Sequence, residues 1–333
     1  MGYNRVMQLV EITDQTIWDN FVSTSPFGHP LQLWAWGEVK KKNGWTPVRL
    51  GVQVGDHLEV AVQLLLWKIP KSKYKLAYVP RGPVIDPLSS EVPGLLEAVA
   101  QAAKDKGAIQ LKIEPAWQGV KLTDSWKKSK DKVLLAETYC IDLNQDEDVL
   151  TGAIQSKARQ YIRKAEREGV TIRRLMGSEE LPKVMAVYED TAQRAGFGLH
   201  SEEYYQTLLE KGGKHNYLLV AEKDGQVVAF VWILAAGSTA FELYGGMTRE
   251  GAKLHGNYAL KAHAMQQMKA EGFKIYDFNG RLNDGVSHFK SLWGATETDW
   301  IGSYNLPLKG LYYKAWQVAW PVGKKLSKIG RKK

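Results

Sequence analysis

The chain contains one pattern twice, at an offset of about 165 residues, and this duplication constrains its fold more than any single motif. Residues 50–69 and residues 218–237 are both apolar segments interrupted by a short polar turn, Gly55-Asp56 in the first and Asp224-Gly225 in the second. Two apolar runs joined by such a turn are typical of a β-hairpin. The sequence therefore predicts two equivalent hairpins in two equivalent units.

Each hairpin belongs to a longer unit of the same composition. A helical pattern and a Gly follow it and lead into a buried strand, at residues 107–115 and 272–280. A strand and a helix also open each copy, around residues 8–24 and 171–191. The order β-α-β-β-β-α-β, present twice, predicts an α/β (α+β) fold with two tandem domains and mixed central sheets.

A length of 333 residues agrees with two domains. We expect the first at residues 1–146, the second at 147–308, and a basic aromatic tail at 309–333. Residues 77–86 are rich in Pro and Gly, so we expect an edge strand or a loop beside a cleft there.

The net charge of +9 is concentrated in the tail. Residues 309–333 hold eight Lys and Arg and no acid, which leaves +1 on the rest of the chain. The tail also contains Tyr312, Tyr313, Trp316 and Trp320, and aromatic residues among cations favour contact with an anionic membrane surface. The alternatives are a solubilising terminus or a helix that packs back onto the first domain.

Several classes of protein are excluded by what the sequence lacks. The single cysteine, Cys140, cannot form an internal disulfide or a Cys-based zinc site. The seven His residues show no metal-binding spacing, and we expect neither a metal nor a cofactor. The longest apolar run, residues 227–236, is about half of a membrane span. With no secretory signal pattern near the start, we expect a cytoplasmic protein.

A helix expected at residues 150–168 carries a basic stripe, with Arg159, Arg163 and Arg167 four residues apart and Lys164 beside them. A solvated helix face is one interpretation. The other is a partner that bears phosphates, because the Arg guanidinium matches phosphate oxygens in geometry.

The order of elements suggests the acyl-CoA N-acyltransferase (GNAT) architecture, which holds a pyrophosphate on a Gly-rich turn at a helix N-terminus. Residues 193–198 match the string of that turn, but they follow a helix rather than the central strand. Residues 251–258 stand in the expected place and lack the pattern. We therefore expect that the second copy does not bind CoA in the usual way.

Polar residues and glycines follow the last strand of the second copy, at residues 276–285, and include Asn279 and Arg281. Ligands of α/β proteins bind at such carboxyl ends of strands. Lys290 lies shortly afterwards, between Phe289 and Trp293. A partly desolvated ammonium there could stabilise an oxyanion that develops during a reaction.

Taken together, the segments resemble the Fem transferases of peptidoglycan bridge synthesis. The likeness covers residues 20–305 in order, through the strings SPFG, LQLWAWGEVKK, AYVPRGPV, SKARQYIRKAEREGV, EEYYQ, LYGG, IYDFNG and FKSLWGA. Fem proteins have two GNAT-like domains and transfer an amino acid from aminoacyl-tRNA to an amine of the stem peptide. Many also carry a coiled-coil hairpin for which this chain has no room, so it is similar to the compact members.

The resemblance implies a transfer site in the second copy. Lys290 matches the lysine required for transfer, and Phe289 belongs to the same Phe-Lys pair. Glu38 and His200 replace two basic residues that hold the acceptor phosphate in a compact relative. Glu114 stands at the place of an acid once considered a general base. The expected substrate-binding residues are Trp36, Glu38, His200, Tyr204, Tyr244, Asn279 and Arg281, and those expected to contact tRNA phosphates are Arg159, Arg163 and Lys164.

The implied partners are aminoacyl-tRNA and a peptidoglycan precursor, either lipid II or UDP-MurNAc-pentapeptide, with Gly, Ala or Ser transferred. The aromatic tail and the loss of two phosphate-contacting residues favour the lipid-linked acceptor, at the inner face of the plasma membrane. We expect a monomer. The alternatives are a CoA-dependent or other N-acyltransferase, an aminoacyl-tRNA–protein transferase, and a binder of tRNA or envelope lipid without catalysis.

Overall fold

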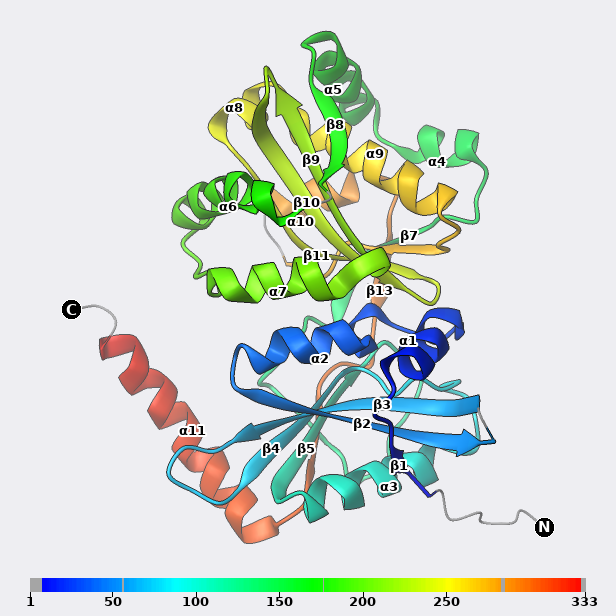
Figure 1. Ribbon diagram of the computed structural model, residues 1–333, viewed down its shortest axis with the longest axis vertical. Helices are drawn as coiled ribbons and strands as arrows, with labels where there is room; N and C mark the ends of the chain where they lie inside the picture. The colour runs from blue at the N-terminus through cyan, green and yellow to red at the C-terminus, as the bar shows by residue number, and fades with distance from the viewer. Residues whose placement is uncertain (1–7, 56, 176, 283–284, 331–333) are drawn as a thin grey trace.

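The computed structural model describes residues 8–55, 57–175, 177–282 and 285–330, with the backbone alone for residues 321–330. Residues 1–7 of the expected first domain and residues 331–333 of the expected tail lie outside the described residues. The chain forms two domains, each around a seven-stranded mixed sheet, stacked one above the other in Figure 1. This confirms the fold predicted from the duplication.

The first sheet has the strand order β1-β2-β3-β4-β5-β14-β6. Its strands are β1 (Val10–Glu11), β2 (Trp45–Val54), β3 (His57–Lys68), β4 (Lys75–Arg81), β5 (Ala108–Pro115), β14 (Tyr304–Pro307) and β6 (Lys127–Lys128). Its helices are α1 (Gln15–Thr24), the short 3₁₀ turn η1 (Pro30–Gln32), α2 (Trp34–Lys41) and α3 (Val92–Asp105).

The second sheet has the equivalent order β8-β9-β10-β11-β12-β7-β13. Its strands are β8 (Thr171–Leu175), β9 (Asn216–Lys223), β10 (Gln226–Ala236), β11 (Thr239–Met247), β12 (Ile275–Asp277), β7 (Glu137–Asp142) and β13 (Thr296–Asp299). Its helices are α4 (Glu147–Ala153), α5 (Ser156–Arg167), α6 (Leu181–Ala195), α7 (Glu202–Gly212), α8 (Arg249–Lys253), α9 (Gly256–Ala270) and α10 (Gly285–Ser291), with 3₁₀ turns η2 (Ser178–Glu180) and η3 (Gly213–His215).

Local chemistry explains several boundaries. The β9–β10 hairpin turns at Asp224 and Gly225, both with positive φ (49° and 76°), as a two-residue turn of this kind requires. Helix α6 ends at Gly196, which adopts the left-handed conformation that side chains disfavour. The string at residues 193–198 is therefore the end of a helix, not a phosphate-binding turn.

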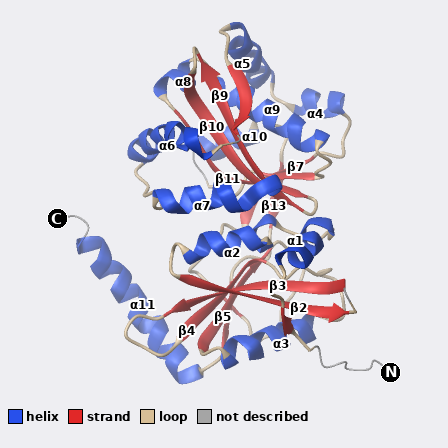
Figure 2. Cartoon of the chain, in the orientation of Figure 1, coloured by secondary structure: helices blue, strands red, loops and turns tan. Residues whose placement is uncertain are grey.

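Helices and sheets alternate in layers through both domains (Figure 2). One apolar cluster lies between α3 and the first sheet, and another between the second sheet and helices α5 and α9. The third joins the domains, because it combines residues of α1 and α2 with residues of α6, α7 and the second sheet. The facing helices α2 and α7 thus share one buried core across the domain interface.

The two sheets exchange strands. The chain that leaves β5 crosses to the second sheet as β7, where it pairs with β12, and the chain that leaves β12 returns as β14 and pairs with β5. Strand β6 pairs with β14, and β13 pairs with β7, so the exchange is reciprocal. Strand β7 lies before the expected boundary at residues 146 and 147, yet it belongs to the second sheet.

The central parallel strands differ between the copies. Strands β4 and β5 stay paired to their ends, up to Arg81 and Pro115. In the second sheet β11 and β12 pair over only three positions, and the last pair is Phe241 with Asp277. Strand β11 continues to Met247 without β12, so the second sheet opens beyond Phe241 on this side.

The structure corrects two expectations from the sequence. Residues 150–168 form parts of two helices rather than one, because Ile154 and Gln155 are extended and separate α4 from α5. Within residues 77–86, expected to be an edge strand or a loop, residues 77–81 belong to the central strand β4. Pro80 is tolerated there because the Gln32 side chain replaces part of the β3–β4 ladder: its amide donates to the Pro80 carbonyl and accepts from the Gln63 N–H.

The C-terminal helix α11 (Gly310–Gly330) extends away from the first domain in Figure 1. Its first half packs on that domain through aromatic rings: Trp316 and Trp320 lie 6.3 Å from Trp67 between ring centroids, and Tyr312 lies 4.4 Å from Tyr74. Leu311 and Val318 remain 79% and 73% exposed. Among the described residues, no helix is both long and apolar enough to cross a membrane.

Candidate active site

The facing helices α2 and α7 bring a lysine into an aromatic cluster at the domain interface. The Lys40 ammonium donates to the Tyr204 hydroxyl over 3.1 Å and lies 4.2 Å from the centroid of the Trp36 ring. Burial lowers the pKa of Lys40 to about 8. In the described part of the chain no carboxylate forms an ion pair with it. In the sequence Lys40 is one of three consecutive lysines, and no local pattern distinguishes it from its neighbours.

Tyr204 connects this lysine to the second sheet. Its hydroxyl lies 3.0 Å from that of Tyr244 on β11, and burial raises the pKa of both phenols. A β-bulge at Leu243, between the pairs Trp232–Tyr244 and Ile233–Glu242, turns Tyr244 to the same face as Phe241. Strand β11 therefore carries the aromatic cluster from Tyr244 to Phe241, about 10 Å along the strand.

Two other expected substrate-binding residues lie beside Lys40. His200 stacks on Tyr204 with ring centroids 4.1 Å apart, and burial together with the charge of Lys40 lowers the pKa of its imidazole. Glu38, by contrast, faces the first domain, where its carboxylate pairs with Arg49 at 2.9 Å and with Lys41 at 2.6 Å. Glu38 is thus held by two cations of its own domain.

Lys290 lies on α10, beside the opening of the second sheet. Its ammonium donates to the carbonyls of Asn279 and Gly280 over 3.2 and 2.7 Å. Phe289 packs edge to face against Tyr258 and Trp293, with ring centroids 5.0 and 5.6 Å apart. The aromatic rings fix α10, and the two carbonyls fix the charged end of its lysine.

Asn279 and Arg281, expected to bind substrate, have different surroundings. Asn279 contributes its backbone carbonyl to Lys290 and adopts a positive φ of 54°. The Arg281 guanidinium lies near two carboxylates of β13, Glu297 at 3.4 Å and Asp299 at 3.5 Å. Arg281 therefore connects the loop that precedes α10 to β13, the edge strand of the second sheet.

Three buried groups that sequence reasoning missed gather where the sheets meet. Asp277 is the last residue of β12, and its carboxylate faces the positive charges of Arg81 and Lys290, while burial raises its pKa. Arg81 is the last residue of β4. His29 packs against Phe241 with centroids 4.9 Å apart, and burial lowers the pKa of its imidazole, with a further contribution from Arg81. Their spacing in the sequence offers no common motif.

Glu114 is the last residue but one of β5, and Asp277 is the last residue of β12. Its two carboxylate oxygens accept hydrogen bonds from the Tyr78 hydroxyl, the Ser303 hydroxyl and the backbone N–H groups of Val133 and Leu134. Four donors occupy the acceptor capacity of a carboxylate. The contacts of Glu114 are those of an anchor for the chain that crosses between the sheets.

The basic stripe on α5 divides into two parts. The Arg159 guanidinium donates to the carbonyls of Thr151, Gly152 and Ile154 and so caps the end of α4. Arg163 and Lys164 are exposed on the same helix. They remain open to a partner in solution, whereas the contacts of Arg159 serve the fold.

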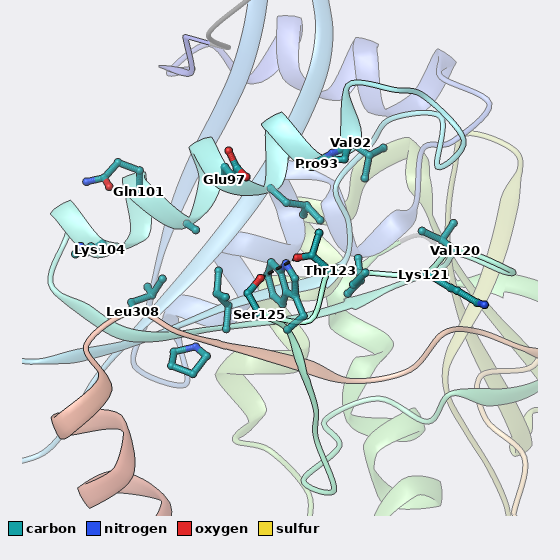
Figure 3. Close-up of a pocket in the computed structure, with 16 residues that line it drawn as sticks. Val92, Pro93, Glu97, Gln101, Lys104, Val120, Lys121, Thr123, Ser125 and Leu308 are labelled. Carbon is teal, nitrogen blue, oxygen red and sulfur yellow. Dashed lines mark hydrogen bonds between the residues drawn. The ribbon is translucent and has the colours of Figure 1, made fainter. Parts of the chain in front are cut away.

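A pocket of about 280 Å³ lies between α3, residues 120–126 and β14 (Figure 3). Val92 and Leu96 of α3 and Leu308 line it, with Lys104 and Lys121 at its rim. The pocket is on the α3 face of the first sheet, opposite the face that carries α2 and Lys40. We therefore place the candidate active site at the domain interface instead.

The arrangement at the interface can bind and polarise anionic groups. Lys40 lies on α2 of the first domain and Lys290 on α10 of the second. Strand β11 carries Tyr244, which contacts the Tyr204 partner of Lys40, and Phe241, which pairs with Asp277 next to the Lys290 turn. A carbonyl oxygen that gains negative charge near one ammonium, or a phosphate near the other, would be stabilised in a partly desolvated site. Among the described residues, no cluster of three or more His, Cys, Asp or Glu side chains could hold a metal ion.

Comparisons with known proteins agree with this architecture. Residues 13–136 match the FemAB family, and residues 154–291 match the acetyltransferase (GNAT) domain. A lipid II:glycine glycyltransferase of Staphylococcus aureus (strain MRSA252) is 25% identical over 419 aligned positions, covering 98% of this chain and 99% of that protein. Because 419 exceeds 333 by 86, that relative contains at least 86 positions absent from this compact chain.

Solved structures share the fold. The crystal structure of FemX superposes with a TM-score of 0.84 at 23% identity, covering 93% of this chain and 99% of that one. A tandem GNAT protein from the clavulanic acid biosynthesis pathway superposes with a TM-score of 0.52 at 11% identity, covering 90% and 98%. With both halves matched in order and two GNAT-like sheets in the structure, the chain belongs to the Fem family and is an acyltransferase of its compact form.

Proposed function

We propose that the protein transfers an aminoacyl group from aminoacyl-tRNA to the stem-peptide amine of a peptidoglycan precursor, with lipid II as the acceptor. The observation that carries the proposal is the pair of lysines at the domain interface, Lys40 in its aromatic cluster and Lys290 on its two carbonyls. The name of the S. aureus relative supports a lipid II substrate and glycine as the first amino acid to test.

The aminoacyl ester is already activated, so the chemical step needs alignment and charge stabilisation more than a covalent intermediate. The neutral amine of the acceptor attacks the ester carbonyl and forms the new N–C bond. Lys290 stabilises the oxyanion of the tetrahedral intermediate. The bond between the carbonyl carbon and the ribose oxygen then breaks, and the proton lost by the amine passes to that ribose oxygen, which leaves with the tRNA.

Lys40 is the candidate contact for the acceptor phosphate. Its ammonium supplies a positive charge close to Glu38, which has replaced a basic residue. The rings of Trp36 and Tyr204 lie against it, and Tyr244 contacts Tyr204. An ammonium in such a desolvated setting binds a phosphate oxygen more strongly than one on an open surface. His200 borders the same site through its stacking on Tyr204.

The exposed cations of α5, Arg163 and Lys164, are the proposed contacts to tRNA phosphates. The tail, residues 309–333 with helix α11, is the proposed contact to the anionic inner face of the plasma membrane, because it holds eight cations and its exposed side chains include Leu311 and Val318. Both assignments rest on charge and exposure.

The test incubates the purified full-length protein with lipid II or UDP-MurNAc-pentapeptide and, separately, Gly-, Ala- or Ser-tRNA, and then weighs the products. We expect one aminoacyl mass added to lipid II, and addition about 10²- to 10³-fold slower by Lys290→Met. The absence of product with every charged tRNA on both acceptors would overturn the proposal. A shift of the melting temperature by acetyl-CoA would instead favour a CoA-dependent acyltransferase.

A further inference from the structure

The turn after β12 holds Lys290 with a backbone that needs support of its own. Asn279 and Gly280 supply the two carbonyls, and both have positive φ, 54° and 93°. The left-handed conformation is unfavourable for a residue with a Cβ, so Asn279 stays in it only where neighbours hold the turn. Something outside the turn must therefore fix the carbonyls that fix Lys290.

Two buried side chains make that contact. The Thr138 hydroxyl donates to Oδ1 of Asp277 over 2.6 Å and accepts from the Gly280 N–H over 3.0 Å. The same Oδ1 accepts from the Asn279 N–H over 2.8 Å. A carboxylate can only accept and an amide N–H can only donate, so the directions in this ring of bonds are fixed by chemistry.

The hydrogen-bonded groups are buried, so the loss of one bond is costly. The relative exposure of Thr138 is 0% and that of Asp277 is 1%. Loss of the hydroxyl would leave the Gly280 N–H without its protein acceptor, in a place where water has no ready access. Thr138 belongs to β7, the strand that the first copy contributes to the second sheet. The exchanged strand thus reaches the backbone that orients Lys290.

We propose that Thr138 and Asp277 are positioning residues for Lys290, an inference that rests on the proposed transfer function. They hold the carbonyls of Asn279 and Gly280, and these carbonyls hold the ammonium where the oxyanion forms. Neither residue needs to contact the substrate. Because transition-state stabilisation depends on distance and direction, a small displacement of the ammonium lowers kcat more than it changes substrate binding.

The first test is Thr138→Val, which keeps the shape of the side chain and removes its hydroxyl. We expect kcat to fall roughly 10- to 100-fold while the KM values for both substrates stay within about twofold. Thr138→Ser keeps the hydroxyl and is expected to restore most of kcat. A purely structural role would not produce this division between kcat and KM.

The matched control is Thr298→Val. Thr298 on β13 lies directly opposite Thr138 in the β7–β13 pair and is also buried. Its hydroxyl donates to the carbonyl of Thr296 in its own strand over 3.4 Å and, among the described residues, forms no hydrogen bond with Asn279 or Gly280. We expect Thr298→Val to leave kcat unchanged. A loss equal to that of Thr138→Val would show that any buried hydroxyl in this strand pair matters, and would overturn the inference.

Two variants of Asp277 test the inference if Thr138→Val does not fold. Asp277→Ala removes the acceptor of the Thr138 hydroxyl and the Asn279 N–H, and kcat is expected to fall. Asp277→Asn retains an oxygen in that place and is expected to recover kcat to within about threefold, because the contacts matter for position. No recovery by Asp277→Asn would overturn the positioning role in favour of a charge effect.

Lys290→Met separates this inference from the proposed function. If Lys290→Met abolishes transfer and Thr138→Val behaves as wild type, the inference fails and the function stands. If Lys290→Met transfers at the wild-type rate, the proposed role of Lys290 fails and the inference fails with it. Support requires that Thr138→Val cause no further loss in a Lys290→Met background, since residues that act as one unit are not additive.

Discussion

The Lys40 ammonium on α2 donates a hydrogen bond across the domain interface to the hydroxyl of Tyr204 on α7, over 3.1 Å. Glu38, two residues earlier on the same helix, forms ion pairs with Arg49 and Lys41. The positive charge of Lys40 therefore faces aromatic rings instead of a carboxylate, which suits an anion that arrives with the substrate.

Substitution of Lys40 is expected to weaken acceptor binding. In Lys40→Met the KM for the acceptor should rise about 10- to 100-fold, the range for a hydrogen bond to a charged group, while the KM for aminoacyl-tRNA stays unchanged. Steady-state kinetics with each substrate varied in turn measures both values. Glu38→Gln is the control on the same helix. An unchanged acceptor KM in Lys40→Met would contradict the phosphate assignment.

The lowered pKa of Lys40 predicts a pH dependence. The ammonium is present below pH 8 and is lost as the pH rises above about 8, so kcat/KM for the acceptor should fall there. Deprotonation of the acceptor amine has the opposite effect, because a rising pH increases the fraction of neutral amine and so raises the rate. Lys40→Arg keeps its charge at all these pH values, and its profile should show no fall. Identical profiles for wild type and Lys40→Arg would exclude Lys40 as the group that titrates.

Removal of the Lys290 charge is expected to affect catalysis. Lys290→Met keeps most of the side-chain volume, and loss of one donor to a developing oxyanion typically lowers kcat about 10²- to 10³-fold. The melting temperature should move little, because the packing of α10 depends on Phe289, Tyr258 and Trp293. Single-turnover kinetics at saturating substrates measures the effect. A kcat within threefold of wild type would remove Lys290 from the mechanism.

The two parts of the α5 stripe should respond differently to substitution. Arg163→Ala with Lys164→Ala is expected to raise the KM for aminoacyl-tRNA and to flatten its dependence on salt, because two phosphate contacts are lost. Arg159→Ala is expected to lower the melting temperature, because its guanidinium caps α4. If the acceptor KM rises in the double variant instead, the stripe contacts the acceptor diphosphate.

The charge of the tail and its packing can be tested with separate variants. Lys324, Lys325 and Lys328 changed to Gln should reduce binding to anionic vesicles by up to about 100-fold, since each cation near such a surface contributes up to ~1 kcal/mol. Deletion of residues 309–333 should also lower the melting temperature, because Trp316 and Trp320 pack on Trp67. Equal pelleting of the triple variant and wild type would contradict a membrane contact.

Local patterns in the sequence predicted most of the architecture. The duplicated hairpins and the Gly-led strands gave the element order of both domains, and Tyr204 and Tyr244, identified separately, are hydrogen-bonded to each other. Lys290 was predicted at the end of the last strand of the second copy, and the structure brings its ammonium to the carbonyls just after that strand. These features follow from short-range periodicity and from motifs.

Long-range contacts account for what the sequence did not predict. Pro80 lies in a central strand because Gln32, far away in the chain, supplies the missing ladder bonds. Lys40 became a site candidate only through its contact with Tyr204 on the other domain. Asp277 and Thr138 meet because β7 crosses between sheets, and no local pattern specifies such a pairing.

The exchange of strands has a consequence for synthesis on the ribosome. Strand β5 keeps a bare edge until Tyr304–Pro307 has emerged, because β14 is the strand that covers it. The sheet of the first domain is therefore incomplete until nearly all of the second half of the chain has been synthesised. An uncovered edge strand pairs readily with other chains, so a truncated or stalled product is expected to aggregate. The two domains of this duplicated chain can therefore complete their folding only together, near the end of synthesis.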